Sequence, residues 1–235
     1  MSRPGAERSR RSGPRPRQRA WRPVAALAAA VVAVAALAGA CGGNEYRWVA
    51  NGNEGNYFKM PSTWAYDVSS GADTAGRSDA LPGSITPVWH VSFNSAEGAP
   101  PQTDANDLPA DLVGNAQIYS LSNYYRENYS ISQVREQLFH GVDPVYPPDD
   151  LSGRVELVSY RPIEEAEGLT GSRVVANINL AEDGGSKWLT VDGSVLFDDR
   201  TGRVFALTME CTTQCYLQNR SMADQVAASW KVNKK

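Results

Sequence analysis

The sequence predicts an α+β fold in which helices pack on an antiparallel β-sheet. First, the C-terminal half holds several runs of alternating apolar and polar residues, joined by short connectors rich in glycine and aspartate, which is typical of hairpins. Second, two segments carry apolar residues at helical spacing behind a serine that can cap a helix. Because strands joined by short connectors become antiparallel neighbours, the helices are left to cover the sheet.

Seven segments have the alternation, or the aromatic and β-branched content, that is typical of strands. Alternation places Trp64, Tyr66 and Val68 on one face of the second segment, and Pro61 ends the first because proline lacks a ladder N–H. Residues 117–121 fit either a strand or the approach to a helix. The seven expected strands are residues 57–60, 64–68, 88–93, 155–160, 172–180, 187–197 and 203–210.

Capping boxes mark the start of the two expected helices. Ser130 and Gln133 form the first box, and Gly141 ends that helix as a C′ glycine. Ser221 and Asp224 form the second box. The apolar stripe of the first helix is Ile131, Val134, Leu138 and Phe139, and that of the second is Met222, Val226 and Trp230.

The last three expected strands form an antiparallel meander that carries most of the sheet. Within the long strand 187–197, the pair Asp192-Gly193 predicts a β-bulge. At the two ends of the domain, Trp64 and Trp230 are both expected to be buried in the core.

Residues 1–40 predict an export signal with an arginine-rich leader. Eight arginines and one acid precede 17 apolar or small residues, which run from Val24 to Ala40. A basic segment, an apolar core and a small-residue end are typical of a secretory signal. The apolar core is also shorter than the roughly 20 residues that a spanning helix needs.

The three residues before Cys41, Ala38-Gly39-Ala40, resemble a bacterial lipobox, although leucine stands four rather than three places before the cysteine. The resemblance implies that Cys41 takes a diacylglycerol thioether and becomes the mature N-terminus. We therefore expect residues 41–55 to be a lipid anchor and flexible tether, on the extracytoplasmic face of the cell membrane. An uncleaved anchor and ordinary secretion are the alternatives.

Charge separates the leader from the rest of the chain. The chain has 23 basic and 26 acidic residues, and removing the leader's eight arginines and one acid leaves 15 and 25, or about −10. This balance argues against nucleic acid, whose phosphates require a basic surface. It also argues against electrostatic adhesion to anionic lipid, so membrane contact is expected through the lipid on Cys41 alone.

The two ends of the expected globular domain, residues 56–232, resemble PsbP-like domains. The spacing of Phe58, Pro61 and Trp64 is similar to the opening of such domains, and residues 228–232 are similar to their Ser-aromatic-basic-Val ending. The resemblance extends to exported lipoproteins of actinobacteria, including mycobacterial ones. It implies a PsbP-like α/β/α sandwich and a non-enzymatic protein that docks on a larger assembly. Residues 233–235 are left as a tail.

Cys211 and Cys215 are the only cysteines besides Cys41, and we expect them to form a structural disulfide, with two free buried thiols as the alternative. The two histidines, His90 and His140, are expected to satisfy a local partner and a helix C-terminus respectively. No catalytic set, metal site or cofactor site is predicted, because no base and nucleophile can be paired.

Two further groups have ordinary structural interpretations. The carboxylates lack the oxygen spacing of a calcium loop and are expected to be solvated turns. The tyrosines are expected to fill the core, with a ligand groove as the alternative. The carboxylates are Glu164-Glu165-Glu167, Glu182-Asp183 and Asp198-Asp199, and the tyrosines are Tyr119, Tyr124, Tyr125 and Tyr129.

Three functions fit these observations. The leading one is a lipid-anchored accessory protein that binds an envelope protein or assembly without catalysis. The second is a carrier or sensor for a small apolar, lipid or glycan ligand. A hydrolase is the remote third. An exposed apolar patch would favour the first function, and a pocket of several hundred cubic ångströms the second.

Overall fold

The computed structural model describes residues 45–70, 87–100, 108–122, 126–127, 129–165, 169–181 and 185–233. The signal segment 1–40 and Cys41 lie outside these ranges. The described strands are β1 (Tyr46–Asn51), β2 (Asn56–Pro61), β3 (Ala65–Ser69), β4 (Pro87–Asn94), β5 (Val113–Ser120), β6 (Val155–Glu165), β7 (Leu169–Asn179), β8 (Trp188–Asp198), β9 (Arg203–Thr212) and β10 (Lys231–Val232). The described helices are α3 (Ile131–Leu138), the 3₁₀ turn η1 (Ser152–Arg154) and α4 (Thr213–Ser229).

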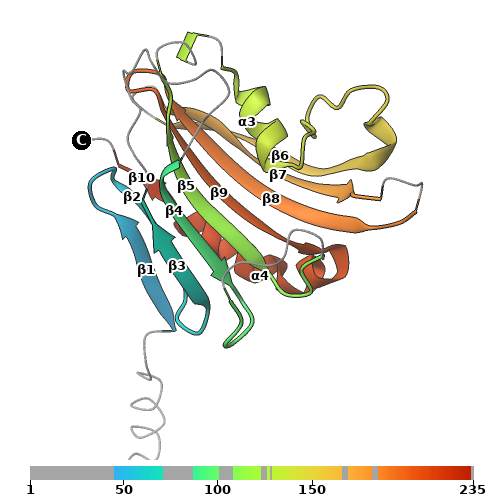
Figure 1. Cartoon of the computed structure of the whole chain (residues 1–235), viewed down its shortest axis with the longest axis horizontal. Helices are drawn as coiled ribbons and strands as arrows, with labels where there is room; N and C mark the ends of the chain where they lie inside the picture. The colour runs from blue at the N-terminus through green and yellow to red at the C-terminus, as the bar shows by residue number, and fades with distance from the viewer. Residues whose placement is uncertain are drawn as a thin grey trace, which may run out of the picture. The chain divides into compact units, whose positions relative to one another are not determined.

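The strands form two antiparallel sheets, in the orders β1-β2-β10 and β3-β4-β5-β9-β8-β7-β6 (Figure 1). The seven predicted strands are all present, and the predicted meander is the run β9-β8-β7, which β6 extends. The undecided segment 117–121 belongs mainly to β5, which begins earlier, at Val113. The predicted fold class, an antiparallel α+β fold with helices packed on the sheet, is therefore confirmed.

Helices α3 and α4 cover opposite faces of the large sheet (Figure 1). Successive side chains of a strand point to opposite faces, and on β8 Asp192 bonds to Tyr216 of α4 while Gly193 faces Phe139, the C-cap of α3. The predicted bulge at this pair is wrong, because its pairing with β7 and β9 is continuous. Glycine is needed there for space, since a Cβ would lie 2.8 Å from the Phe139 ring.

Helix α3 begins where the sequence predicts. The Ser130 side chain accepts the Gln133 N–H at 3.3 Å, and the Gln133 side chain accepts the Ser130 N–H at 2.8 Å. This reciprocal pair is the predicted capping box. At the other end the prediction of Gly141 as the C′ residue is wrong by one position, because the C-cap is Phe139 and C′ is His140, at a φ of 54°. Gly141, at a φ of 87°, is C″, and its N–H donates to the Glu136 carbonyl at 2.7 Å.

Helix α4 is longer than predicted, because it begins at Thr213 rather than at Ser221. Its N-cap is Thr212, whose side chain accepts the N–H of Cys215 at 3.3 Å. The first two turns are mostly polar and exposed, so they carry little helical periodicity in the sequence. Burial of Cys215 and Tyr216 against the sheet makes these turns helical.

Both predicted core tryptophans are buried. Trp64 stacks on Phe93, with ring centroids 5.7 Å apart, and the Trp230 indole N–H donates to Asn56 Oδ1 at 2.7 Å. Tyr66 and Val68, which the alternation places on one face with Trp64, are exposed and do not share its burial. Trp64 precedes the first residue of β3, so the alternation of the strand does not extend to it.

The flexible tether predicted over residues 41–55 is wrong for its described part. Strand β1 pairs with β2 from Tyr46 opposite Pro61 to Asn51 opposite Asn56. The connecting turn is closed by the Asn51 side chain, which accepts two backbone N–H groups, and by a glycine at φ 66°. The ordered domain therefore begins upstream of Asn56. Among the described residues no helix is long and apolar enough to cross a membrane.

Candidate functional site

A groove of about 430 Å³ lies between helix α4 and strands β6 to β8, on the face of the sheet that α4 covers. It forms because the outer strands β6 and β7 extend beyond the helix, whose main contacts are with β2, β8 and β9. We call it the α4 groove. Its walls and floor include Val158 and Arg161 of β6, Arg173 and Asn177 of β7, and Leu217 and Arg220 of α4.

The floor of the α4 groove is a hydrogen-bonded network around the buried carboxylate of Asp192. Arg173 donates to both carboxylate oxygens, from Nε at 2.8 Å and from Nη2 at 2.6 Å. The Tyr216 hydroxyl donates to Oδ2 at 2.8 Å. Arg173 Nη2 also donates to Asp224 Oδ1 at 2.6 Å, so this one guanidinium joins strand β7 to β8 and to α4.

Arg173 and Tyr216 in this network both stay protonated at neutral pH. The hydrogen bond to Asp192 raises the pKa of Arg173, despite the opposing effect of burial. Burial raises the pKa of Tyr216, and the negative charge of Asp192 raises it further. At neutral pH Tyr216 is therefore a neutral donor and Arg173 a fixed cation, and neither exchanges a proton readily. Such a floor suits binding better than acid–base chemistry.

A second polar row continues the floor toward strand β6. Asn177 donates to Glu156 Oε2 at 2.8 Å and accepts the Thr190 hydroxyl at 2.6 Å. Thr190 also contacts the Thr213 hydroxyl at 3.2 Å, at the first turn of α4. These contacts cross from β6 through β7 and β8 to the helix and fix the width of the groove. The described residues that line the groove include no histidine and no free thiol.

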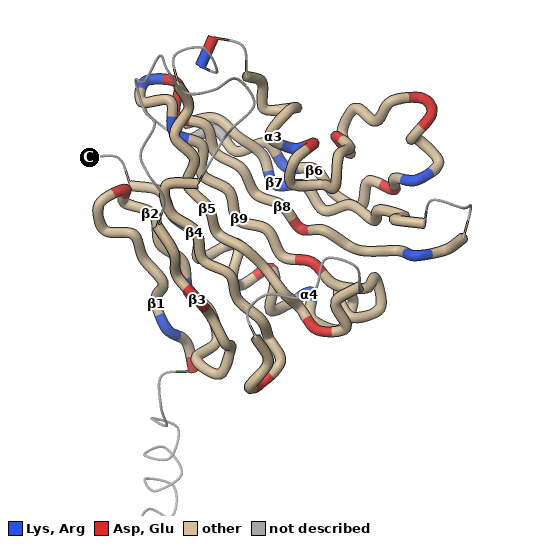
Figure 2. Tube along the Cα trace, viewed as in Figure 1, with Lys and Arg blue, Asp and Glu red and all other residues tan. Residues whose placement is uncertain are grey.

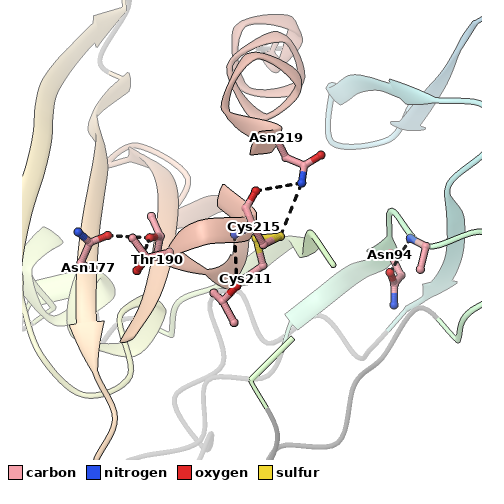
Figure 3. The surroundings of a disulfide bond; sticks show 9 residues. Asn94, Asn177, Thr190, Cys211, Cys215 and Asn219 are labelled. Atoms are coloured by element: carbon pink, nitrogen blue, oxygen red, sulfur yellow. Dashed lines mark hydrogen bonds between the residues drawn. A yellow bond between two sulfur atoms is a disulfide. The ribbon is translucent and has the colours of Figure 1, made fainter. Parts of the chain in front are cut away.

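The predicted disulfide between Cys211 and Cys215 is present, with Cα atoms 5.9 Å apart (Figure 3). It joins the end of β9 to the first turn of α4, and both cysteines are buried. Asn219, one turn further on, donates to the Cys215 carbonyl at 3.0 Å. The bridge thereby fixes the start of the helix that forms one wall of the α4 groove.

The two histidines lie apart from the groove and from each other. His90 Nε2 is 2.8 Å from Asn115 Oδ1 on the neighbouring strand β5, so it satisfies the local partner that was predicted. His140 Nε2 is 2.8 Å from Glu210 Oε2, and this hydrogen bond raises the pKa of His140. His140 follows α3, as predicted, but its partner is a carboxylate of β9 rather than the helix terminus.

The remaining sequence candidates form no common site in the described part of the chain. Asp198 is buried and accepts the Arg200 N–H at 3.1 Å, which is a turn contact. Tyr119 lies on β5, and burial raises its pKa to about 12. No group of three His, Cys, Asp or Glu residues in the described ranges is arranged to hold a metal ion. Outside the description are Cys41, Tyr124, Tyr125, Glu167, Glu182 and Asp183, and the side chains of Glu164 and Glu165.

Sequence reasoning missed the whole Asp192 network. One signal was available: an acid inside an apolar central strand must find a partner, because an unpaired buried charge is costly. The partners themselves carry no signal in the sequence. Arg173 lies on β7, whereas Tyr216 and Asp224 lie on α4. Only the folded sheet and helix bring Arg173 and Tyr216 to the Asp192 carboxylate and Asp224 to Arg173.

Comparisons with known proteins give distant structural similarities. The chain is similar to cyanobacterial PsbP (CyanoP) from Synechocystis sp. PCC 6803, with 16% identity and a TM-score of 0.47 over 82% of this chain and 95% of that one. It is similar to the Saccharomyces cerevisiae Ran-binding protein Mog1p, with 8% identity and a TM-score of 0.43 over 80% and 95%.

A third similar structure is LpqN, a protein involved in cell envelope biogenesis of Mycobacterium tuberculosis. The identity is 14% and the TM-score 0.37, over 81% of this chain and 93% of that one. No family model matches the sequence, and no curated protein matches it. The functional interpretation therefore depends on the residues of this chain.

Proposed function

We propose that this chain is a PsbP-like lipoprotein, anchored through Cys41 on the extracytoplasmic face of the membrane, which binds an envelope protein without catalysing a reaction. The export signal and lipobox-like residues support the location. The α4 groove and the neighbouring strand β6 (Val155–Glu165) support the binding function. Figure 2 shows that the acidic and basic positions of the described residues are spread over many elements.

The observation that carries this proposal is the exposure of β6 beside the groove. Among the described strands, β6 is an edge of the large sheet and pairs with β7 alone. Val158 and Tyr160, which line the groove, are exposed along it, and across the groove Leu217 of α4 is 67% exposed. Apolar side chains of this size around a satisfied polar floor are typical of a protein-binding surface.

The floor supports binding over catalysis for a further reason. Arg173 is engaged by two carboxylates and the Tyr216 hydroxyl by one, so these groups are positioned before any partner arrives. A pre-organised surface loses little conformational entropy on binding. The same groups have pKa values displaced away from neutrality, which does not suit general acid–base work.

A carrier of a small ligand is the second candidate. The observation that favours it is the volume of the α4 groove, about 430 Å³, which lies within the range of small-molecule sites. Such a ligand would contact the same apolar residues, Val158 and Leu217. The two functions therefore differ in the size of the molecule that occupies the groove, and one experiment can separate them.

Site-specific photo-crosslinking in the native envelope tests the proposal. A photo-reactive amino acid replaces Leu217 in the full chain, and in a matched control it replaces Tyr146, which is 75% exposed and follows α3. We expect a discrete protein adduct from position 217 and none from position 146. A small-mass adduct at 217 would instead support the carrier, and equal labelling at both positions would contradict a specific site.

Anchoring is tested separately with Cys41→Ala. We expect this variant to leave the membrane fraction while the domain stays folded, because the lipid is proposed to be the anchor. A Cys41→Ala chain that remains bound to membranes after a high-salt wash would show that residues 24–40 anchor it instead. Intact-mass measurement of the native protein gives an independent reading of the lipid.

A further inference from the structure

The length of chain between the proposed lipid and the domain places one surface close to the membrane. Strand β1 begins at Tyr46, five residues after Cys41. A fully extended chain spans at most about 3.6 Å per residue, so the start of β1 lies within about 18 Å of the lipidated residue. The end of the β1–β2 hairpin that carries Tyr46 and Pro61 therefore stays close to the bilayer.

The outer face of this hairpin presents an aromatic and cationic cluster. Trp48 is directly opposite Lys59 in the β1–β2 pairing, so the two side chains share a face, and Trp48 is 57% exposed. Lys59 Nζ lies 4.6 Å from the centroid of the Trp48 ring. The Tyr57 ring packs edge-on against Trp48, with centroids 5.4 Å apart. We call Trp48, Tyr57 and Lys59 the hairpin face.

A second cation–aromatic pair lies beside the hairpin. The Arg47 guanidinium stands 5.0 Å from the centroid of Tyr66 on strand β3, and Val68, two residues further along that strand, is also exposed. Two acids, Glu45 and Asp67, are also exposed at this end. The local charge is therefore close to neutral, and attraction to anionic lipid would be weak.

This combination of residues suits one environment in particular. Trp and Tyr are favoured at the membrane–water interface, because their rings accept the apolar side while their polar groups stay hydrated. Lys and Arg stems pack along the rings and hold the charge toward phosphate. An aromatic surface that the anchor keeps near the bilayer gains these contacts without needing a net positive charge.

We infer that the hairpin face contacts phospholipid head groups when the chain is anchored. This inference rests on the proposed lipidation of Cys41, and it replaces the expectation that the lipid alone touches the membrane.

Fluorescence of a single environment-sensitive dye tests the contact. The dye is attached at Ala50→Cys, because Ala50 is exposed, shares the alternation of Trp48 and leaves the hairpin face intact. The matched control carries the dye at Tyr146→Cys. In the lipidated chain Cys41 is blocked and Cys211–Cys215 is a disulfide, so the new cysteine is the reactive one.

The lipidated chains are reconstituted into phosphatidylcholine vesicles with or without a head-group spin label. We expect the dye at position 50 to shift to the blue and to lose intensity with the spin-labelled lipid, while the dye at 146 does neither. Adding Trp48→Ser and Lys59→Ser to Ala50→Cys should abolish both effects while the chain stays on the vesicles.

The possible outcomes separate the inference from the proposed function. If the chain is lipidated but the dyes at 50 and 146 behave alike, the hairpin face does not contact lipid, and the proposed anchoring stands. If the effects at position 50 survive removal of Trp48 and Lys59, the contact does not depend on these side chains and the inference is overturned. A native chain without lipid on Cys41 would overturn both.

Discussion

The β1–β2 hairpin and the floor of the α4 groove use cations in different ways. Beside the hairpin, Lys59 and Arg47 lie over aromatic rings, and Trp48 beneath Lys59 is largely exposed. In the groove floor, Arg173 is held by two carboxylates and only 14% of its side chain is exposed. The difference teaches that the group in contact with a cation decides whether its charge is available for a further contact. A ring leaves the charge free for a further contact, whereas paired carboxylates consume it in the structure.

The largest expected effect is the loss of folding stability when a buried tryptophan, rather than the exposed Trp48 of the hairpin, is replaced. Trp64→Ala and Trp230→Ala should each lower the free energy of unfolding by about 3–5 kcal/mol, because each removes a large buried ring. Trp48→Ala should change it by less than about 0.5 kcal/mol, because that ring is mostly exposed. Urea denaturation measures all three. Similar losses for Trp48 and Trp64 would make the hairpin face part of the core.

The next largest effect is the loss of stability when the floor of the α4 groove is changed. Asp192→Asn should cost about 3 kcal/mol, because it leaves Arg173 and the Tyr216 hydroxyl without their buried charged acceptor. Asp224→Asn is the matched control, and since half of that side chain is exposed its cost should stay below about 1 kcal/mol. Equal costs in urea denaturation would mean that Asp192 does not organise the floor.

The disulfide should contribute less. Cys211 and Cys215 close a ring of only five residues, for which loop entropy predicts a stabilisation of about 2 kcal/mol. The double replacement by alanine should lower stability by about that amount and loosen the wall of the α4 groove, while the dye signal at the hairpin face stays unchanged. Alkylation of denatured, unreduced protein should label neither cysteine, and labelling of both would rule out the bridge.

The smallest expected effect is a pH dependence of folding stability, to which the cations of the hairpin and of the groove do not contribute. Lysine and arginine keep their charge near neutral pH, so the titrating group is His140, whose pKa is raised by Glu210. Because the folded pKa is higher than the unfolded value of about 6.5, this stabilisation is fully present below that pH and is lost as pH rises through the folded pKa.

Urea midpoints between about pH 6 and pH 8 test this dependence. Stability should fall with rising pH in the native chain, and Glu210→Gln should flatten the dependence because it removes the acceptor charge. An unchanged slope in this variant would assign the dependence to another group.

Much of the fold could be predicted because its signals are local. Alternation marked every strand of the β9-β8-β7-β6 meander, and Ser130 with Gln133 marked the start of α3. Strand register in a sheet and capping at a helix end depend on residues close in sequence, which a pattern can show. The cysteine spacing likewise predicted a bridge that the structure contains.

What the sequence by itself determined about this protein is therefore its fold class, most of its strands and one disulfide. Only the tertiary structure decided where α4 begins, because burial of Cys215 and Tyr216 outweighs the weak helical pattern of that segment. Only the tertiary structure assembled the α4 groove around Asp192. Its bonds join residues 19 to 51 positions apart, and contacts between distant elements exist only once the sheet and helix are in place.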